Sequence, residues 1–233
     1  MNTTEEVIKS IRKLENQANI EGKARFGIKV DYCFGLSVPQ IRLIAKKVGK
    51  NHTLALALWN TKFHEARQIA SMIADPNEIT EKLMEQWAKD FNSWDIVDGC
   101  CSSLFRKTPF AYSKAKEWCG RKEEFVRRAG FSMMAALAVH DKKAEDAEFE
   151  QFFPYIYKYS DDERNFVKKA VNWALRQIGK RNERLCKKSI KLAKEIKLKD
   201  DASSKWIAND ALRELEKYLL EGKIKNIGAE NRN

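Results

Sequence analysis

Two residues that could do chemistry, Trp94 and Asp98, lie four positions apart in the stretch Phe91–Cys101. Asn92 and Ser93, the two residues before Trp94, are residue types that cap exposed backbone N–H groups where helices begin. If a helix begins there, this spacing places the indole and the carboxylate on one face. An aromatic surface beside a carboxylate can bind a cationic ring and stabilise developing positive charge. The structural alternative places Trp94 in the core and makes Asp98 an acid that complements the helix dipole.

The composition favours a helical protein with a polyanionic partner. The chain has 233 residues, enough for one large domain or two small ones, and its 43% hydrophobic content excludes a chain disordered by composition. Only four Pro and ten Gly interrupt it, which favours helices. The formal net charge of +11 indicates nucleic acid as the simplest partner.

The cysteines and histidines show no spacing typical of a metal site. None of the five Cys forms a CxxC pair, and the three His are scattered. We therefore expect thiols in a reducing cytoplasm, with no metal and no cofactor. The polar first 13 residues predict no signal peptide, and no apolar run is long enough to span a bilayer. The expected location is the cytoplasm, away from the membrane.

Apolar residues recur at helical spacing along nearly the whole chain. One helix is expected from Thr3 to Ala18, and a second begins after Ser37 and ends at Gly49. The intervening stretch Glu21–Gly35 holds three glycines and is expected to be irregular. No segment shows strand alternation or a hairpin signal, so the predicted fold class is all-α.

The second half carries a repeat of about forty residues. Ala129, Ala170 and Ala211 are spaced 41 residues apart, and each follows two apolar and two polar residues. A small residue at this place lets a neighbouring helix approach, and a period near forty is typical of HEAT-like repeats. We predict a superhelical stack of HEAT-like antiparallel helix pairs with a concave basic cleft. Residues 1–218 are expected to form one domain, and residues 219–233 a frayed polar tail.

Basic residues recur at helical spacing in one stretch near the end of the repeats. They are Lys180, Arg184, Lys187, Lys191 and Lys194. The spacing predicts a single stripe along one helix, which either faces solvent or contacts nucleic acid. The acids of residues 161–163 are expected in the first turn of a helix. Four of the six tryptophans are expected in the core: Trp59, Trp87, Trp118 and Trp206.

Several separated segments resemble the AlkD-like bacterial DNA alkylation repair glycosylases. They are residues 93–98, 126–129 and 170–176, and residues 34–39 resemble the N-terminal signature of that family. The resemblance covers about residues 26–215. It implies a scaffold of HEAT-like repeats that hydrolyses the N-glycosidic bond of alkylated purines.

The resemblance also implies roles for individual residues. Asp98 matches the essential carboxylate, Trp94 the aromatic residue one turn before it, and Trp173 a second tryptophan of the cleft. Arg128 matches the arginine of the cleft. Arg127 is its rival, because the interval from Asp98 is a few residues shorter than the family pattern.

Phe26 aligns with a position at which well-studied members have Tyr. The substitution removes a hydroxyl group, together with any hydrogen bond that this group would make. We expect Phe26 to contact DNA in the same region of the cleft.

One carboxylate suffices for the implied reaction, because a cationic alkylated purine leaves without being protonated. The prediction is a monofunctional, monomeric DNA glycosylase that releases 3-methyladenine or 7-methylguanine from duplex DNA in base excision repair. The alternatives are a non-catalytic HEAT-like nucleic-acid binder, which would not depend on Asp98, and a protein-interaction scaffold.

Overall fold

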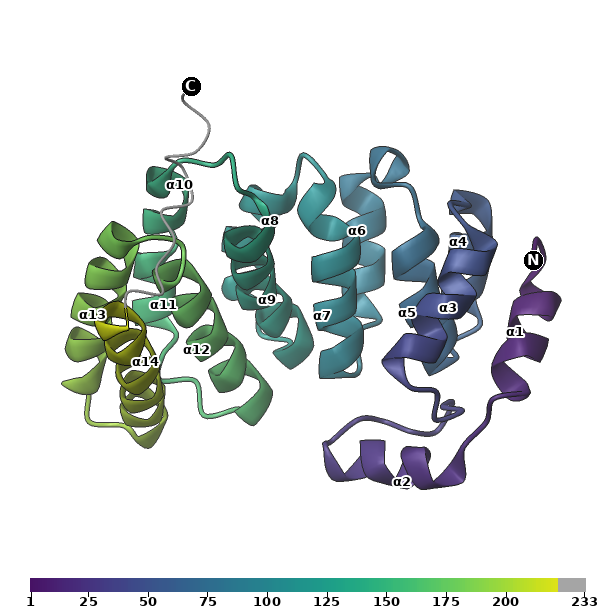
Figure 1. The fold of residues 1–233 in the computed structure, drawn as a ribbon, viewed down its shortest axis with the longest axis horizontal. Coiled ribbons are helices and arrows are strands. Elements are labelled where there is room, and N and C mark those ends of the chain that lie inside the picture. Colours follow the sequence, from purple (N-terminus) through teal and green to yellow (C-terminus); the bar gives the residue numbers. More distant parts are fainter. Residues whose placement is uncertain (222–233) are drawn as a thin grey trace. The chain divides into compact units, whose positions relative to one another are not determined.

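The computed structural model describes residues 1–221, and helices joined by turns make up this part of the chain, with no strand. The all-α prediction is confirmed (Figure 1). The chain divides into two compact units, Met1–Phe110 and a second that begins at Ala111. That residues 1–218 act as one domain stays a prediction. The expected tail over 219–233 lies almost wholly outside the described residues, since the last helix ends at Leu220.

The first unit contains seven α-helices and two short 3-10 helices. They are α1 (Thr4–Arg12), α2 (Gln17–Arg25), α3 (Val38–Val48), α4 (His52–Asn60), α5 (His64–Ile73), η1 (Pro76–Glu78), α6 (Glu81–Lys89), α7 (Trp94–Ser103) and η2 (Phe105–Lys107). The Thr3 hydroxyl caps α1 by accepting from the backbone N–H of Glu6. Ser37 precedes α3, whose end at Gly49 has a φ of 75°, as the glycine predicted.

The region between α1 and α3 differs from the prediction. The expected helix from Thr3 to Ala18 ends at Arg12, and α2 extends to Arg25, into a stretch that was expected to be irregular; residues 26–35 are irregular as expected. The side chain of Asn16 starts α2 by accepting from the backbone N–H of Asn19 at 3.0 Å. None of the residues of α2 is buried. This helix therefore lacks the apolar periodicity by which a sequence reveals a helix.

Aromatic side chains from three elements fill the core of the first unit. The indoles of Trp59 and Trp87 stack with centroids 4.0 Å apart, and Phe91 and Phe105 pack around them. Buried apolar area of this kind is the main force that holds the helices together. Helix α5 runs through this core between α3, α4 and α7 and is buried along nearly its whole length.

The second unit is built of helix pairs. Its helices are α8 (Ala111–Cys119), α9 (Glu124–His140), α10 (Asp146–Glu150), α11 (Phe153–Lys158), α12 (Asn165–Gly179), α13 (Glu183–Lys197) and α14 (Ala202–Leu220). Helix α8 packs on α9, and α13 packs on α14. The alanines of the 41-residue repeat, Ala129, Ala170 and Ala211, lie on α9, α12 and α14 and are fully buried. Since α12 packs against both α9 and α14, the HEAT-like repeat prediction is confirmed in this unit.

Three expectations for the second unit are wrong. Lys180 belongs to the end of α12 rather than to the helix of the other basic residues, because Asn182 starts a new helix there. The indole of Trp206 is 40% exposed beneath the Lys168 ammonium, whereas Trp59, Trp87 and Trp118 are buried as expected. The acids of residues 161–163 precede α12, which begins at Asn165.

Within residues 1–221, no helix is long and apolar enough to cross a bilayer. The same range holds no group of three or more His, Cys, Asp or Glu side chains placed to bind a metal ion. All five cysteines are buried.

Candidate functional site

Helix α7 begins at Trp94, where the capping residues predicted a helix start. The Ser93 hydroxyl does not cap a backbone N–H but donates to the Asp95 carboxylate. The i, i+4 spacing then brings Trp94 and Asp98 to the same cleft of the first unit. Both side chains are half-buried in its wall.

This cleft has a volume of about 1010 Å³, and α2, α3, α5, α7 and η2 supply its lining. Phe26, Trp94 and Asp98 all line it, so the structure brings together the three predicted site residues of the first unit. The indole N–H of Trp94 donates to the backbone carbonyl of Phe26 at 3.1 Å. This bond fixes the plane of the indole relative to the end of α2.

Basic side chains surround the two carboxylates of the cleft. The charged residues of the lining are Lys23, Arg42, Arg106, Lys107, Asp95 and Asp98. Burial lowers the pKa of Lys107, and the neighbouring charges of Arg106 and Lys50 lower it further. Cations crowded in this way attract phosphate groups, which relieve their repulsion.

Asp95 is a site residue that the sequence analysis did not assign. Its carboxylate accepts from His64 Nε2 at 2.7 Å and from Gln68 Nε2 at 2.9 Å, both on α5. Ser93 and the backbone N–H of Ile96 donate to the other oxygen. Burial opposes ionisation, but His64 and these donors outweigh it, so the pKa of Asp95 lies below its usual value. Asp95 therefore joins the first turn of α7 to α5.

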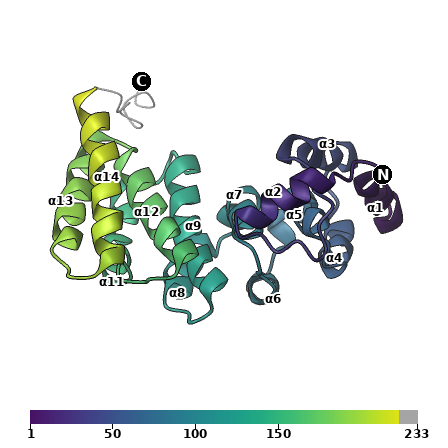
Figure 2. The same cartoon turned by 90° about the horizontal axis from the view of Figure 1, so that it is seen from below.

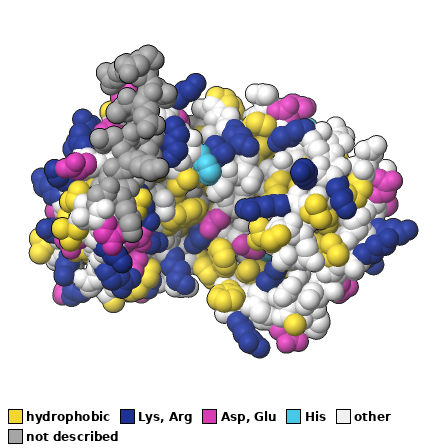
Figure 3. All heavy atoms as spheres, viewed as in Figure 1, with side chains coloured by type: hydrophobic (Ala, Val, Ile, Leu, Met, Phe, Trp, Pro, Cys, Tyr) yellow, Lys and Arg dark blue, Asp and Glu magenta, His cyan; other side chains and the backbone are white. Residues whose placement is uncertain are grey.

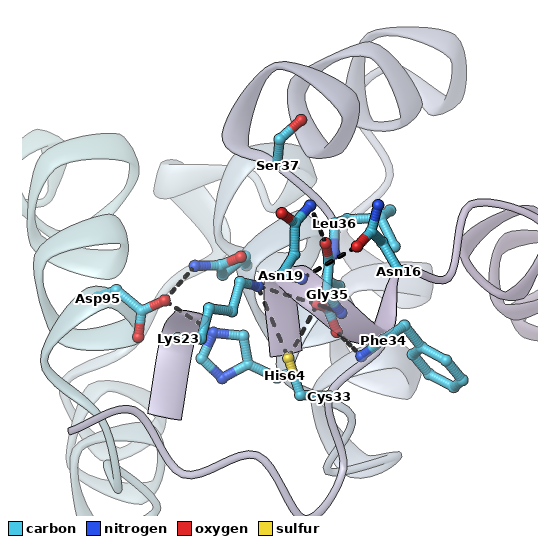
Figure 4. A network of polar contacts seen from close by, with 12 residues as sticks. Asn16, Asn19, Lys23, Cys33, Phe34, Gly35, Leu36, Ser37, His64 and Asp95 are labelled. Atoms are coloured by element: carbon cyan, nitrogen blue, oxygen red, sulfur yellow. Dashed lines mark hydrogen bonds and ion pairs between the residues drawn. The ribbon is translucent and has the colours of Figure 1, made fainter. Parts of the chain in front are cut away.

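Glu65 forms a second polar cluster under the same wall, and it too was missed from sequence. Its fully buried carboxylate accepts from the Lys23 ammonium at 3.0 Å and from the Cys33 thiol at 3.2 Å. Three backbone N–H groups also donate to this carboxylate: those of Phe34 at 3.0 Å, Gly35 at 2.9 Å and Leu36 at 3.2 Å. Figure 4 shows the loop and α2 converging on these contacts.

The charges of this cluster fit together. Burial alone would raise the pKa of Glu65, but Lys23 and the loop donors outweigh it and hold the pKa below its usual value. Burial and the adjacent Glu65 carboxylate raise the pKa of the Cys33 thiol to about 11. The cluster therefore contains an ionised Glu65 that fastens α2 and the loop before α3 to α5.

The remaining predicted residues belong to the second unit. Arg128, on α9, is only 6% exposed and donates to the backbone carbonyl of Phe166 at 2.5 Å. Arg127 pairs with Asp162 at 2.7 Å, and its guanidinium lies 4.7 Å from the ring centre of Tyr159.

Trp173 is half-buried on α12, the helix that packs on α9. The two arginines and Trp173 thus lie on neighbouring helices of the second unit. Their role in binding DNA stays a prediction.

Helix pairs that repeat at a spacing of 41 residues define an all-α protein of the HEAT-like repeat class. The family described as "DNA alkylation repair enzyme" matches residues 7–215, and the chain belongs to this family. Membership and fold together support a DNA-binding role in repair.

Two proteins are similar to this chain at low sequence identity. A solved structure from "a new family of proteins related to the HEAT-like repeat DNA glycosylases with affinity for branched DNA structures" matches with a TM-score of 0.80. It is 20% identical, and the match covers 96% of each chain. The uncharacterized protein Lin0241 of Listeria innocua is 22% identical over 166 residues, which is 70% of this chain and 72% of its own. The structural match shows a shared fold.

Proposed function

We propose that the protein is a monofunctional, monomeric DNA glycosylase that hydrolyses the N-glycosidic bond of cationic alkylated purines in duplex DNA. The observation that carries the proposal is that Trp94 and Asp98 line one cleft together with Arg42, Arg106 and Lys107. The indole face suits a cationic base, and the carboxylate suits the positive charge that develops on the sugar. Arg42, Arg106 and Lys107 suit the DNA phosphates on either side of the alkylated nucleotide.

The two carboxylates of the cleft have different tasks in this proposal. Asp95 is engaged by His64, Gln68 and Ser93, which suits it to hold α7 in place. Asp98 lies one turn further along the same helix, and we assign the chemistry to it. Its carboxylate stabilises the oxocarbenium-like sugar and orients the attacking water. No proton needs to reach the departing base, because an N3- or N7-alkylated purine already carries positive charge.

The second unit contributes DNA contacts in this proposal. Arg128, or its neighbour Arg127, holds a backbone phosphate, and Trp173 packs against the nucleotide. Phosphate contacts position the protein on DNA without reading sequence, as repair of scattered lesions requires.

Release of free base tests the proposal. The wild-type protein, incubated with a duplex that carries 7-methylguanine, should release the base in a form that chromatography detects. Asp98→Asn keeps the shape of the side chain but removes its charge. It should slow release at least about a hundredfold, on the order of 3 kcal/mol, while DNA binding persists. Release at the wild-type rate by folded Asp98→Asn would exclude this mechanism.

A second candidate function is non-catalytic binding of branched DNA. The relative with the same fold, whose family has affinity for branched DNA structures, favours it. Tight binding of a four-way junction, without base release from any alkylated duplex, would support this candidate over the glycosylase.

A further inference from the structure

An exposed aromatic ring stands at the mouth of the cleft. Phe26 follows the last residue of α2, and its side chain is 72% exposed although it lines the cleft. A phenyl ring has no polar group with which to compensate for this exposure. Its surface is thus available for contact with an apolar or aromatic ligand.

The support of this ring is fixed in place. The backbone carbonyl of Phe26 accepts from the Trp94 indole at 3.1 Å, and its backbone N–H donates to the carbonyl of Lys23 at 3.0 Å. Figure 2 shows α2 lying across α5 and α7. Although α2 buries no side chain, the Lys23–Glu65 ion pair and a bond from Asn19 to the Gly35 carbonyl at 2.9 Å tie it down. The exposed ring therefore belongs to an anchored segment rather than to a frayed end.

The residues that line the cleft beside Phe26 indicate the chemical class of its ligand. A second exposed apolar side chain of the lining, Val38, is 49% exposed. Besides Lys23, which pairs with Glu65, the cations of the lining are Arg42, Arg106 and Lys107. On the face of the first unit seen in Figure 3, hydrophobic side chains lie among lysines and arginines. An aromatic surface among cations fits a nucleobase whose phosphates meet the basic groups.

Bases in an intact duplex stack on both neighbours and offer no face to a protein ring. A base beside a gap, a nick or a branch point lacks one neighbour, and its face can stack on an aromatic side chain. We propose that Phe26 stacks on such an exposed base, so that the cleft selects DNA whose base stacking is interrupted. The proposal rests on the proposed binding of DNA and adds the feature of DNA that is recognised.

The test compares two DNA molecules that differ only in stacking. One is an intact duplex, and the other has a one-nucleotide gap with 2-aminopurine, a base whose fluorescence reports stacking, at its edge. Affinity and fluorescence are measured with the full chain for the wild type, Phe26→Ala and Phe26→Tyr. Leu43→Ala is the matched control, because Leu43 is an exposed apolar residue of the same unit (53%) outside the lining of the cleft.

The wild type should bind the gapped DNA about tenfold more tightly than the duplex and quench 2-aminopurine. Phe26→Ala should lose both the preference for gapped DNA and the quenching. Phe26→Tyr and Leu43→Ala should retain both. An unchanged preference in Phe26→Ala, or an equal loss in Leu43→Ala, would overturn the inference and leave the proposed function standing. Absence of binding to either DNA would contradict the proposed function itself.

Discussion

Replacing Glu65 with Ala should loosen α2 and the loop that precedes α3. The carboxylate is fully buried and accepts from the Lys23 ammonium and from the backbone N–H groups of residues 34, 35 and 36. Alanine would leave all these donors without their partner. The Lys23 side chain is only 17% exposed, so water cannot fully replace the lost contact.

The magnitude follows from the burial of the pair. Removing one member of a buried ion pair costs about 3–5 kcal/mol, because the other charge stays behind in a medium of low polarity. Each buried N–H left unpaired adds about 1–3 kcal/mol unless the loop moves to reach water. If the loop moves so that its N–H groups reach water, only the ion-pair term remains, and we expect Glu65→Ala to lower the free energy of unfolding by about 4 kcal/mol.

Urea unfolding and hydrogen exchange together measure this effect. The backbone amides of Phe34, Gly35 and Leu36 should exchange faster in Glu65→Ala, whereas amides of α9 should keep their wild-type rates. The double variant Glu65→Ala, Lys23→Met should regain part of the stability, since it removes the stranded ammonium. The control is Glu183→Gln, whose carboxylate is 58% exposed and pairs with Lys187 one turn away; its unfolding midpoint should not change. A loss under about 1 kcal/mol in Glu65→Ala would refute the reasoning.

Three further predictions address backbone strain, acid and salt. Gly35→Ala should destabilise far more than Gly49→Ala in urea unfolding: both glycines have positive φ, but only at Gly35 would a Cβ overlap a carbonyl oxygen. The pKa values of Glu65 and Asp95 are lowered, so the stability that these carboxylates contribute is complete above about pH 4 and is lost as the pH falls below it. Glu65→Gln should therefore reduce the acid-induced loss in the free energy of unfolding, measured as a function of pH. Arg128→Gln should reduce the slope of log affinity for DNA against log salt by about one unit, and an unchanged slope would exclude a phosphate contact.

The sequence predicted those parts of the fold that bury apolar side chains at regular spacing. Ala129, Ala170 and Ala211 were recognisable because each must be small where α12 meets its neighbours. Helix α2 was missed because it buries nothing and depends on the Lys23–Glu65 pair, whose members are 42 positions apart. Trp206 was placed in the core by default, although its side chain is 40% exposed and lies beneath the Lys168 ammonium.

The candidate site was likewise predicted only in part from the sequence. Trp94 and Asp98 share a cleft because helical spacing alone brings them to one face. The His64–Asp95 and Glu65 clusters escaped prediction because they join elements that only the tertiary fold brings together. The polar residues of α5 gather on one face of the helix, a pattern equally typical of a solvated face, so the sequence carried no signal for these clusters.

The most direct test of the central claim is a single-turnover comparison of cationic and neutral lesions in one duplex context. Wild-type protein should release 7-methylguanine and 3-methyladenine but neither uracil nor hypoxanthine, because the site has no assigned group to protonate a departing base. Asp98→Asn should lose the release of both cationic bases. Comparable rates on cationic and neutral lesions would contradict the account and make His64 or His140 the first proton donors to examine. Loss of activity in Asp95→Asn with full activity in Asp98→Asn would contradict the assignment of the carboxylate.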